Sequence, residues 1–511
     1  MIPSFAALLT QEQVERVHLA SLVILENVGI LVRNQRARGI FAANGGRVSP
    51  ESEIVRLPGE IVEHYQRMFS PGFTFYGRDP RFDRAIPDDS PLILTGSSAP
   101  NIIDPVTGYE RRARSDDLAR IAHLINELPG YDVFSISTLA DDAPPGQFSL
   151  TRFYPAIKNT LKPVRANTPP AEAEAMLRLA YLVAGGEAAF RERPFITFHY
   201  CPVVSPLTMD YDSTELLIFF AERDLPSYFS IVPNAGLTSP LTMPATLAQC
   251  NAEFLAAAVL TQMIRPGKAL IYSTLPTVAD MRTGAYSPGA IETGMLHMGC
   301  AQMARFYNLT AGGYIGLTNS KINDAQSGYE TGMSVVAGYL GGVHIFNMGG
   351  LLDALMAFDF AKAVIDGEIA MMLKRLARGF EFSEAELAMD QVTEIGPGGM
   401  FAGTEHTLQR MRSAMYLADI ADRDPRAQWR ERGGLDAQAR ALRKAQEILT
   451  RLNPAFLTPD VDALIRHEFP GVVAGDSLPP EGWKRLPRGI EAEDELGDRR
   501  RRRRHLREVA A

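Results

Sequence analysis

The sequence predicts an α/β fold built as a (β/α)8, or TIM-type, barrel, and three observations support this. Short runs rich in β-branched and aromatic residues recur along the chain, with starts roughly 30 to 55 residues apart. Each run is followed by a loop and a longer stretch of helical periodicity, which is the pattern of parallel strands joined by right-handed crossovers. No GxGxxG follows an early strand and no Walker loop occurs, so an open nucleotide-binding sheet is disfavoured.

Taken in order, the eight candidate strands are residues 131–136, 162–168, 194–204, 227–236, 268–275, 308–317, 342–350 and 395–403. Segments such as "TLAQCNAEFLAAAVLTQMI" and "AIETGMLHMGCAQMARFY" lie between them and are expected to be crossover helices. The stretch "IYSTLPTVADMRTGAYSPGAIE" (271–292) is predicted to hold the end of the fifth strand and the polar loop after it.

The rest of the chain is predicted to flank this barrel. Residues 1–90 are expected to form an N-terminal, mainly helical extension, because "TQEQVERVHLASLVILENVGILV" has apolar residues at helical spacing. The barrel is assigned to 91–420, and a charged helical region, 421–485, is expected to pack outside it. Residues 486–511 combine an acidic block with six consecutive arginines. This pattern favours a disordered, solvated tail, and an arm for nucleic acid or an anionic surface is the alternative.

Bulk composition narrows the class of protein. A net charge of -8 argues against nucleic acid as the main partner. The three cysteines lie far apart without a CxxC motif, which is typical of a reducing, cytoplasmic setting. No run approaches 18 uninterrupted apolar residues, so no transmembrane helix and no membrane partner are expected.

In a (β/α)8 barrel the functional groups lie at the carboxyl ends of the strands and in the loops after them. The candidate substrate-binding residues there are Phe198, Tyr200, Phe229, Asn234, Tyr272, Asp280, Arg282, Tyr314, His344 and Asn347. Side chains alternate along a strand, so about half of those on strands are expected to face helices instead. Aromatic rings outnumber carboxylates in this set, which suits recognition of a quaternary ammonium group.

Other chemistries have weaker support in the sequence. No G-x-S-x-G motif precedes a helix and no HExxH occurs, so no catalytic triad or zincin site is predicted. His199, Cys201, Cys300 and His344 could in principle approach a zinc ion, but their spacing is not diagnostic, and no metal ligand is assigned. No catalytic residue is assigned either.

Several stretches resemble the trimethylamine methyltransferase family, in family order and over nearly the whole chain. They are "ILENVGILV" near the start, "GSSAPNIIDPVTGYERRARSDDLARIAHLI" (96–125), "PLTMPATLAQCNAEFLAAAVLTQMIRPGKALIYST" (240–274), "ADMRTGAYSPGAIE" (279–292), "SKINDAQSGYE" (320–330) and "GPGGMFAGTEHTLQRMRSAMY" (396–416). The resemblance implies a barrel that moves a methyl group from an amine to the cob(I)alamin of a separate corrinoid protein. The corrinoid is expected on that partner and not tightly bound to this chain.

The type members of this family carry pyrrolysine, whereas all 511 residues here are standard. The chain therefore resembles the pyrrolysine-free branch, some of whose members demethylate glycine betaine. A quaternary amine already carries its positive charge and leaves as a neutral amine, so such an enzyme needs no covalent activator. The expected donor is a quaternary or tertiary methylamine. A zinc-dependent methyltransferase and a non-catalytic methylated-amine binding protein are the alternatives, and a homo-oligomer is possible.

Some candidate residues keep two interpretations. Arg282 and His344 are the preferred groups for a substrate carboxylate, but Arg282 could instead fix its loop through Asp280. Tyr272 and Phe229 are cage walls if they point inward and core residues otherwise. Asn347 and Asn234 are favoured as site groups because a buried amide without partners is costly.

Overall fold

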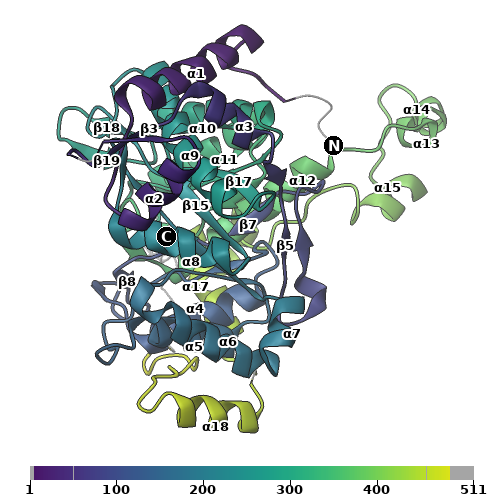
Figure 1. The fold of residues 1–511 in the computed structure, drawn as a ribbon. Helices are drawn as coiled ribbons and strands as arrows, with labels where there is room; N and C mark the ends of the chain where they lie inside the picture. Colours follow the sequence, from purple (N-terminus) through teal and green to yellow (C-terminus); the bar gives the residue numbers. More distant parts are fainter. Residues whose placement is uncertain (1–4, 50, 456, 484–511) are drawn as a thin grey trace, which may run out of the picture.

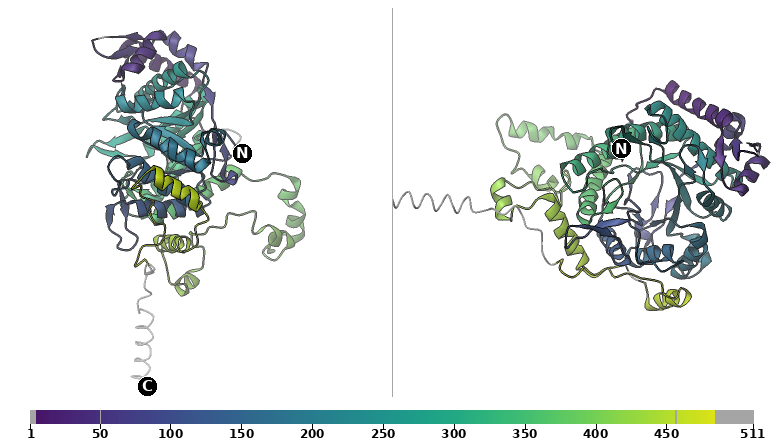
Figure 2. Two further views of the ribbon diagram at one scale, coloured as in Figure 1. Left: turned by 60° about the horizontal axis from the view of Figure 1, so that its bottom comes forward. Right: turned by 90° about the vertical axis from the view of Figure 1, so that its left-hand side faces the viewer.

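The computed structural model describes residues 5–49, 51–455 and 457–483 (Figure 1). The acidic and arginine-rich tail predicted for 486–511 lies outside these residues. Within them, a parallel barrel occupies the centre, the N-terminal segment covers one flank, and the C-terminal helices run along another (Figures 1 and 2).

Eight parallel strands form the barrel, as predicted. In chain order they are β7 (Leu92–Leu94), β10 (Phe134–Ser135), β11 (Val164–Ala166), β12 (Ile196–Tyr200), β15 (Ser227–Ile231), β17 (Ala269–Thr274), β20 (Thr310–Gly313) and β21 (Ile345–Asn347). The last strand, β21, pairs in parallel with the first, β7, with Ile345 beside Leu92. A parallel bridge from Leu94 to Val133 joins β7 to the residue just before β10. This pairing closes the ring.

One predicted strand is wrong. Residues 395–403 contain no strand: helix α14 ends at Ile395, and Gly396 and Gly398 follow with positive φ angles of 64° and 81°. The eighth strand is β7, at the start of the barrel. Length does not set it apart, because β11 and β21 also have three residues and β10 has two.

A helix follows each strand, so the chain makes eight successive strand–helix units. These helices are α4 (Ser115–Glu127), α5 (Phe148–Asn159), α6 (Ala173–Ala184), α8 (Tyr211–Glu222), α9 (Met243–Ile264), α10 (Ile291–Phe306), α11 (Ala325–Gly341) and α12 (Phe360–Arg378). Aspartates begin three of them: Asp210, Asp324 and Asp359 each accept a hydrogen bond from a backbone N–H of the first turn. Strands β12 and β15 are buried along their whole length, as expected for a parallel sheet covered on both faces.

The N-terminal segment combines helices with short strands. It holds α1 (Gln11–Val23), α2 (Gln35–Ala43) and α3 (Gly59–Gln66), together with β1 (Ile30–Val32), β2 (Arg47–Val48) and β3 (Ile54–Arg56). Helices α1, α2 and α3 all pack on α9. Strand β1 also pairs with β14 (Thr208–Met209), which lies in the loop after β12, so this segment is tied to the barrel through a mixed sheet.

Helix α9 is the one described helix long and apolar enough to cross a membrane. In this structure 89% of its most apolar window is buried among α1, α2, α3 and the barrel strands. A core helix between two layers has this composition for packing reasons alone.

After α12 the chain leaves the barrel before it returns. Three short helices, α13 (Glu384–Leu387), α14 (Met389–Ile395) and α15 (Glu405–Arg410), project away from the body (Figure 2). The chain then forms α16 (Arg426–Glu431), α17 (Ala437–Leu449) and α18 (Pro459–Glu468). Helix α17 packs on α12 and α4, and α18 packs on α6, so both cover the outside of the barrel.

Candidate functional site

A pocket of about 450 Å³ opens at the carboxyl ends of β7, β11, β12 and β20, where a barrel of this kind places its chemistry. Strand ends and following loops supply most of its wall, and the first turns of α5 and α8 supply the rest. Its lining is Ser97, Ser98, Phe148, Arg152, Arg165, Asn167, Thr168, Pro169, His199, Tyr200, Cys201, Ser213, Leu216 and Tyr314.

Arg165 on β11 is the hub of this pocket. Its guanidinium is buried, with 3% of the residue exposed. Nη1 donates to Asn347 Oδ1 at 2.7 Å and to Ser135 Oγ at 3.2 Å, while Nη2 donates to the Tyr314 hydroxyl and to His199 Nδ1 at 3.0 Å. Residues from four strands or strand ends therefore hold one positive charge inside the barrel. A guanidinium keeps its charge even at such a buried position.

The same bonds fix the state of His199. An arginine can only donate, so Nδ1 of His199 accepts and its proton sits on Nε2, which is 2.8 Å from Ser230 Oγ. Burial, together with the neighbouring Arg165, holds the pKa of His199 well below its usual value. This imidazole is neutral at physiological pH and has no free acceptor nitrogen with which to act as a base.

Arg152 on α5 is a second buried cation, with 2% of the residue exposed. Its Nη2 donates to Ser98 Oγ at 3.0 Å and its Nε to the Thr138 carbonyl at 3.3 Å. Its guanidinium carbon lies 5.1 Å from the centre of the Phe148 ring. Burial lowers the pKa of Arg152 to about 10, so it stays charged at neutral pH. Nη1 has no hydrogen-bond partner within the described chain, and it belongs to a side chain that lines the pocket.

The electrostatics of the pocket are one-sided. Two guanidinium groups line it and no carboxylate does, although Glu172 lies near enough to Arg152 to oppose the lowering of its pKa. Aromatic rings complete the wall: Phe148 and Tyr314 line the cavity, and Tyr228 lies nearby, with its ring centre 5.8 Å from the Arg165 guanidinium. Tyr200 also lines the pocket, but its ring stacks on Phe220 of α8 with ring centres 5.8 Å apart and so belongs to the strand–helix layer. The pocket can therefore neutralise an anionic group at one end and present ring faces to an apolar or cationic group at the other.

Three of the residues chosen from the sequence meet here. Tyr314 and Tyr200 line the pocket, and Asn347 lies directly behind it at the end of β21, where its Nδ2 donates to the Gly313 carbonyl at 3.2 Å. Asn347 is fully buried and its amide is satisfied on both sides, by Arg165 and by that carbonyl.

Three predicted cage rings lie elsewhere. Phe198 stacks on Phe220 of α8 with ring centres 4.4 Å apart, and Phe229 and Tyr272 pack on Phe254 of α9 at 5.6 and 4.2 Å. All three point outward into the strand–helix layer. The inward positions on these strands are one residue away, because side chains alternate along a strand.

The predicted loop pair Asp280 and Arg282 lies on the rim, outside the pocket. β18 (Thr277–Asp280) and β19 (Ala285–Ser287) form a hairpin after β17, and Arg282 in its turn donates from Nε to Asp280 Oδ1 at 2.9 Å. The Arg282 side chain is 89% exposed. This bonding holds the pKa of Asp280 down at about 2. The geometry matches the loop-fixing interpretation of the pair.

Asn234 and His344 are also separate from the pocket. Asn234 on β16 (Asn234–Ala235) pairs with β18, and its buried Oδ1 has no partner within the described chain. His344 precedes β21 and so lies at the amino end of the barrel, with Nε2 3.0 Å from Asp88 Oδ1. His344 therefore lies at the end of the barrel opposite the pocket, because the strand begins only at Ile345.

The residues considered for zinc do not converge. His199 is inside the barrel near its carboxyl end, whereas His344 is at the opposite end. Cys300 lies on α10 and Cys201 is in the pocket wall, where burial raises the pKa of its thiol to about 11. Among residues 5–49, 51–455 and 457–483, no three histidine, cysteine, aspartate or glutamate side chains cluster as metal ligands.

Sequence reasoning missed the two arginines. The run "KPVRANT" predicts a strand, and a charged residue in the middle of a buried strand is the signal that points to Arg165. Arg152 offered no such signal, because an arginine on a helix is ordinary until the structure shows it turned into a cavity.

The fold and this pocket define a class: a (β/α)8 barrel enzyme with a cationic, aromatic-lined pocket at its catalytic end. The chain belongs to the trimethylamine methyltransferase (MTTB) family, whose sequence profile matches residues 2–469. The chain is 31% identical over 463 residues to the glycine betaine methyltransferase of Desulfitobacterium hafniense strain Y51, covering 90% of this chain and 95% of that protein.

Other relatives carry a different name. A trimethylamine methyltransferase MttB of D. hafniense strain DCB-2 is 29% identical, covering 89% of this chain and 92% of that protein. The MttB of Methanosarcina thermophila is 28% identical, covering 86% and 92%. Among solved structures, the hydroxylamine complex of MtmB aligns over 92% of this chain and 96% of that one, with a TM-score of 0.45 and 12% identity.

Proposed function

We propose that this protein transfers a methyl group from a quaternary methylamine such as a betaine to the Co(I) corrinoid of a partner protein. The observation that carries the proposal is the pairing of two buried guanidinium groups with aromatic rings in one pocket that has no carboxylate. Family membership supports the methyl-transfer chemistry, and the relative named for glycine betaine supports an amine of this kind.

The charges of the pocket suit a zwitterion. A carboxylate of the substrate would accept hydrogen bonds from the free Nη1 of Arg152, and Ser98 beside it is a further donor. The positive field of Arg165, deep in the barrel, would draw the same carboxylate inward. The trimethylammonium end then lies toward the open mouth, against the rings of Tyr314 and Phe148.

This orientation accounts for the transfer step without an acid or base from the protein. The corrinoid, when its carrier is docked, supplies the electron pair that forms the new bond to the methyl carbon. The electrons of the breaking C–N bond remain on nitrogen, which leaves as a neutral tertiary amine. His199 is neutral and hydrogen-bonded on both ring nitrogens, so it holds the pocket in shape and moves no proton. The task of the protein is to hold one methyl group in line with the incoming cobalt.

The two alternatives make different demands on these residues. A zinc-dependent methyltransferase needs three or four converging ligands, which the described residues do not bring together. A non-catalytic binding protein would use the same pocket without transfer, so only an assay separates it from the enzyme. A cytoplasmic location stays a prediction, in keeping with three cysteines that form no disulfide.

The test combines the purified protein with a reductant, free or protein-bound cob(I)alamin, and a panel of methylated amines. Conversion of Co(I) to methylated cobalamin, followed by absorbance, should occur with one or more quaternary amines. A protein that binds these amines by calorimetry but methylates no corrinoid would establish the binding-protein alternative. Activity lost on chelation and restored by zinc would establish the other one.

A further inference from the structure

A second surface, outside the pocket, is both apolar and exposed. Residues 379–415, here called the arm, leave the barrel after α12 and project from the body (Figure 2). No residue of the arm is buried. Its hydrogen bonds to the rest of the described chain come from its root, where Arg375 donates to the Ala414 carbonyl at 3.0 Å and Arg378 to the Ser413 carbonyl at 3.4 Å.

The arm is apolar as well as exposed. Ten large apolar residues of the arm are at least 40% exposed, including Phe380 at 83%, Phe382 at 79%, Met400 at 78% and Met415 at 70%. At about 100 Å² each, they offer on the order of 1,000 Å², which exceeds the roughly 800 Å² per partner of a stable interface. Short helices without a buried face do not hold their shape alone in water, so this arm needs a permanent cover.

Acidic side chains are interspersed with these apolar residues. In "GFEFSEAELAMD" (379–390), Glu381 and Glu384 alternate with the two phenylalanines. Neither glutamate, nor Asp390 further along, makes an ion pair within the described chain. The surface that covers this segment should therefore combine apolar walls with unpaired positive charge.

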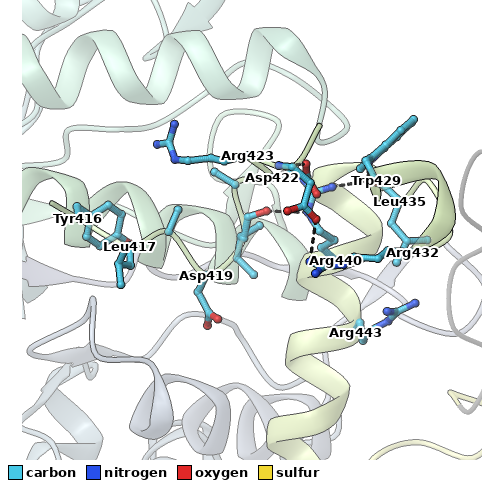
Figure 3. Close-up of a pocket in the computed structure, with 14 residues that line it drawn as sticks. Tyr416, Leu417, Asp419, Asp422, Arg423, Trp429, Arg432, Leu435, Arg440 and Arg443 are labelled. Atoms are coloured by element: carbon cyan, nitrogen blue, oxygen red, sulfur yellow. Dashed lines mark hydrogen bonds and ion pairs between the residues drawn. The ribbon is translucent and has the colours of Figure 1, made fainter. Parts of the chain in front are cut away.

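Such a surface follows the arm in the sequence. A cleft of about 470 Å³ is formed by residues 416–443, between the return of the arm and α17 (Figure 3). Its apolar lining includes Leu417, Trp429 and Leu435, and the Trp429 indole is fixed by a hydrogen bond from Nε1 to the Leu435 carbonyl at 2.9 Å. This wall is preformed and is not filled by the described residues.

Some of the arginines that line the cleft have no ion-pair partner in the described chain. Arg432 pairs with Asp424 at 2.7 Å, and Arg440 donates from Nε to the Ile420 carbonyl at 2.7 Å. Arg423 and Arg443 also line the cleft, and neither makes an ion pair within the described chain. Three aspartates line it too: Asp424 pairs with Arg432 and Asp419 with Lys444, so Asp422 is the lining carboxylate left without an ion pair in the described chain. The Nε atom of Arg443 is buried without any hydrogen-bond partner there, although leaving such a donor unpaired is costly.

We propose that the arm of one copy docks in the cleft of a second copy, with the segment 380–387 between the apolar wall and the free arginines. Arm and cleft are adjacent in the chain, so a two-fold axis would let both copies exchange arms reciprocally in a closed dimer. A corrinoid carrier does not fit this role, because a carrier has to leave after each methyl transfer whereas the arm needs permanent cover. The exclusion of the carrier rests on the proposed function, whereas the match between arm and cleft does not.

The first test is the mass of the full-length protein in solution by sedimentation velocity or light scattering. The chain mass is 56.1 kDa, and the wild type should sediment as a dimer or a larger assembly of dimers at micromolar concentration. Phe382→Asp in the arm, or Arg423→Glu with Arg443→Glu in the cleft, should lower the mass toward that of one chain. Tyr109→Asp, at a residue 78% exposed and far from both surfaces in sequence, is the matched control and should leave the assembly intact.

A charge exchange separates docking from simple unfolding. The cleft double variant should regain its dimer when combined with Glu381→Arg and Glu384→Arg in the arm, because the attraction is restored with opposite signs. A monomeric wild type would overturn the inference. So would a dimer that none of these arm and cleft variants weakens, or an arm protected from proteolysis only when a corrinoid protein is added.

Discussion

Arg165 and Asn347 meet inside the barrel, with Nη1 of the arginine donating to Oδ1 of the asparagine at 2.7 Å, although 182 residues separate them. They sit on β11 and β21, and both are almost fully buried. Closure of the barrel brings them together, so the position of the buried charge depends on the ring being complete. The amide also bonds the Gly313 carbonyl on the neighbouring strand, which leaves it one orientation.

This relationship gives a first prediction. Asn347→Leu keeps the approximate size of the side chain but removes an acceptor from a buried guanidinium, and we expect it to destabilise the protein by about 1–3 kcal/mol. Asn347→Asp should behave differently, because a carboxylate pairs with Arg165 and cancels its field in the pocket. We expect Asn347→Asp to lower the denaturation midpoint less than Asn347→Leu does. We also expect Asn347→Asp to raise the KM for a betaine. Equal KM values for Asn347→Asp and wild type would contradict the role given to the Arg165 charge.

Arg152 should contribute to substrate affinity and little to the transfer step. Arg152→Gln removes a charge-assisted contact to the substrate carboxylate, for which we expect a 10- to 100-fold rise in KM with a smaller change in kcat. Arg152→Lys should recover part of the affinity, because it restores the charge without the fork of donors. The measurement is the initial rate of Co(I) methylation against betaine concentration, with calorimetry as an independent check on binding.

The charge of the ligand gives a third prediction. A pocket with two cations and no carboxylate should bind glycine betaine and reject choline, which has the same trimethylammonium group and lacks the carboxylate. We expect choline and tetramethylammonium to bind at least tenfold more weakly than the betaine, in calorimetry at matched ionic strength. Equal affinities would show that the rings alone hold the ligand and that Arg152 faces something else.

Much of the fold was predictable because a repeated pattern carries it. Seven of the barrel strands lie in runs that the sequence pattern predicts, whereas Leu92–Leu94 does not, although β11 and β21 are no longer than it is. The candidate site was harder, since its residues depend on which way each strand side chain points. Phe198 and His199 are neighbours on β12, yet one packs on a helix and the other bonds Arg165. A one-residue difference decides this: the run "ITFHY" alternates apolar and polar residues, but the sequence does not show which of the two faces points into the barrel.

Arg282 provides a matched control for the pocket arginines. Its side chain is 89% exposed and is bonded to Asp280 two residues away, so both charges stay in the hairpin turn. We expect Arg282→Ala to keep KM and kcat for a betaine within twofold of wild type, measured beside Arg152→Gln in the same assay. A large rise in KM for Arg282→Ala would move the carboxylate contact from the pocket to the rim, as the sequence first suggested.

The buried histidines predict a loss of stability in mild acid. Burial holds the pKa of His199 well below 6.5, lowers that of His297 to about 3, and also lowers the pKa values of His18 and His123. The unfolded chain binds protons at these positions near pH 6.5, and the folded chain does not, so the free energy of unfolding falls as the pH drops below that value. Each strongly depressed histidine contributes a slope of about 1.4 kcal/mol per pH unit.

Urea denaturation between pH 5 and pH 8 measures this slope. Above pH 7 these histidines should make the free energy of unfolding almost independent of pH. From pH 6.5 to pH 5 the free energy of unfolding should fall progressively. His199→Asn keeps a hydrogen-bonding side chain that does not titrate. Between pH 6.5 and pH 5 it should therefore lower the slope of the free energy of unfolding against pH by about the contribution of one histidine. An unchanged slope in this variant would mean that His199 is protonated in the folded protein. In that case Nδ1 could not accept from Arg165, and the hydrogen bonds around the buried guanidinium would have to be reassigned.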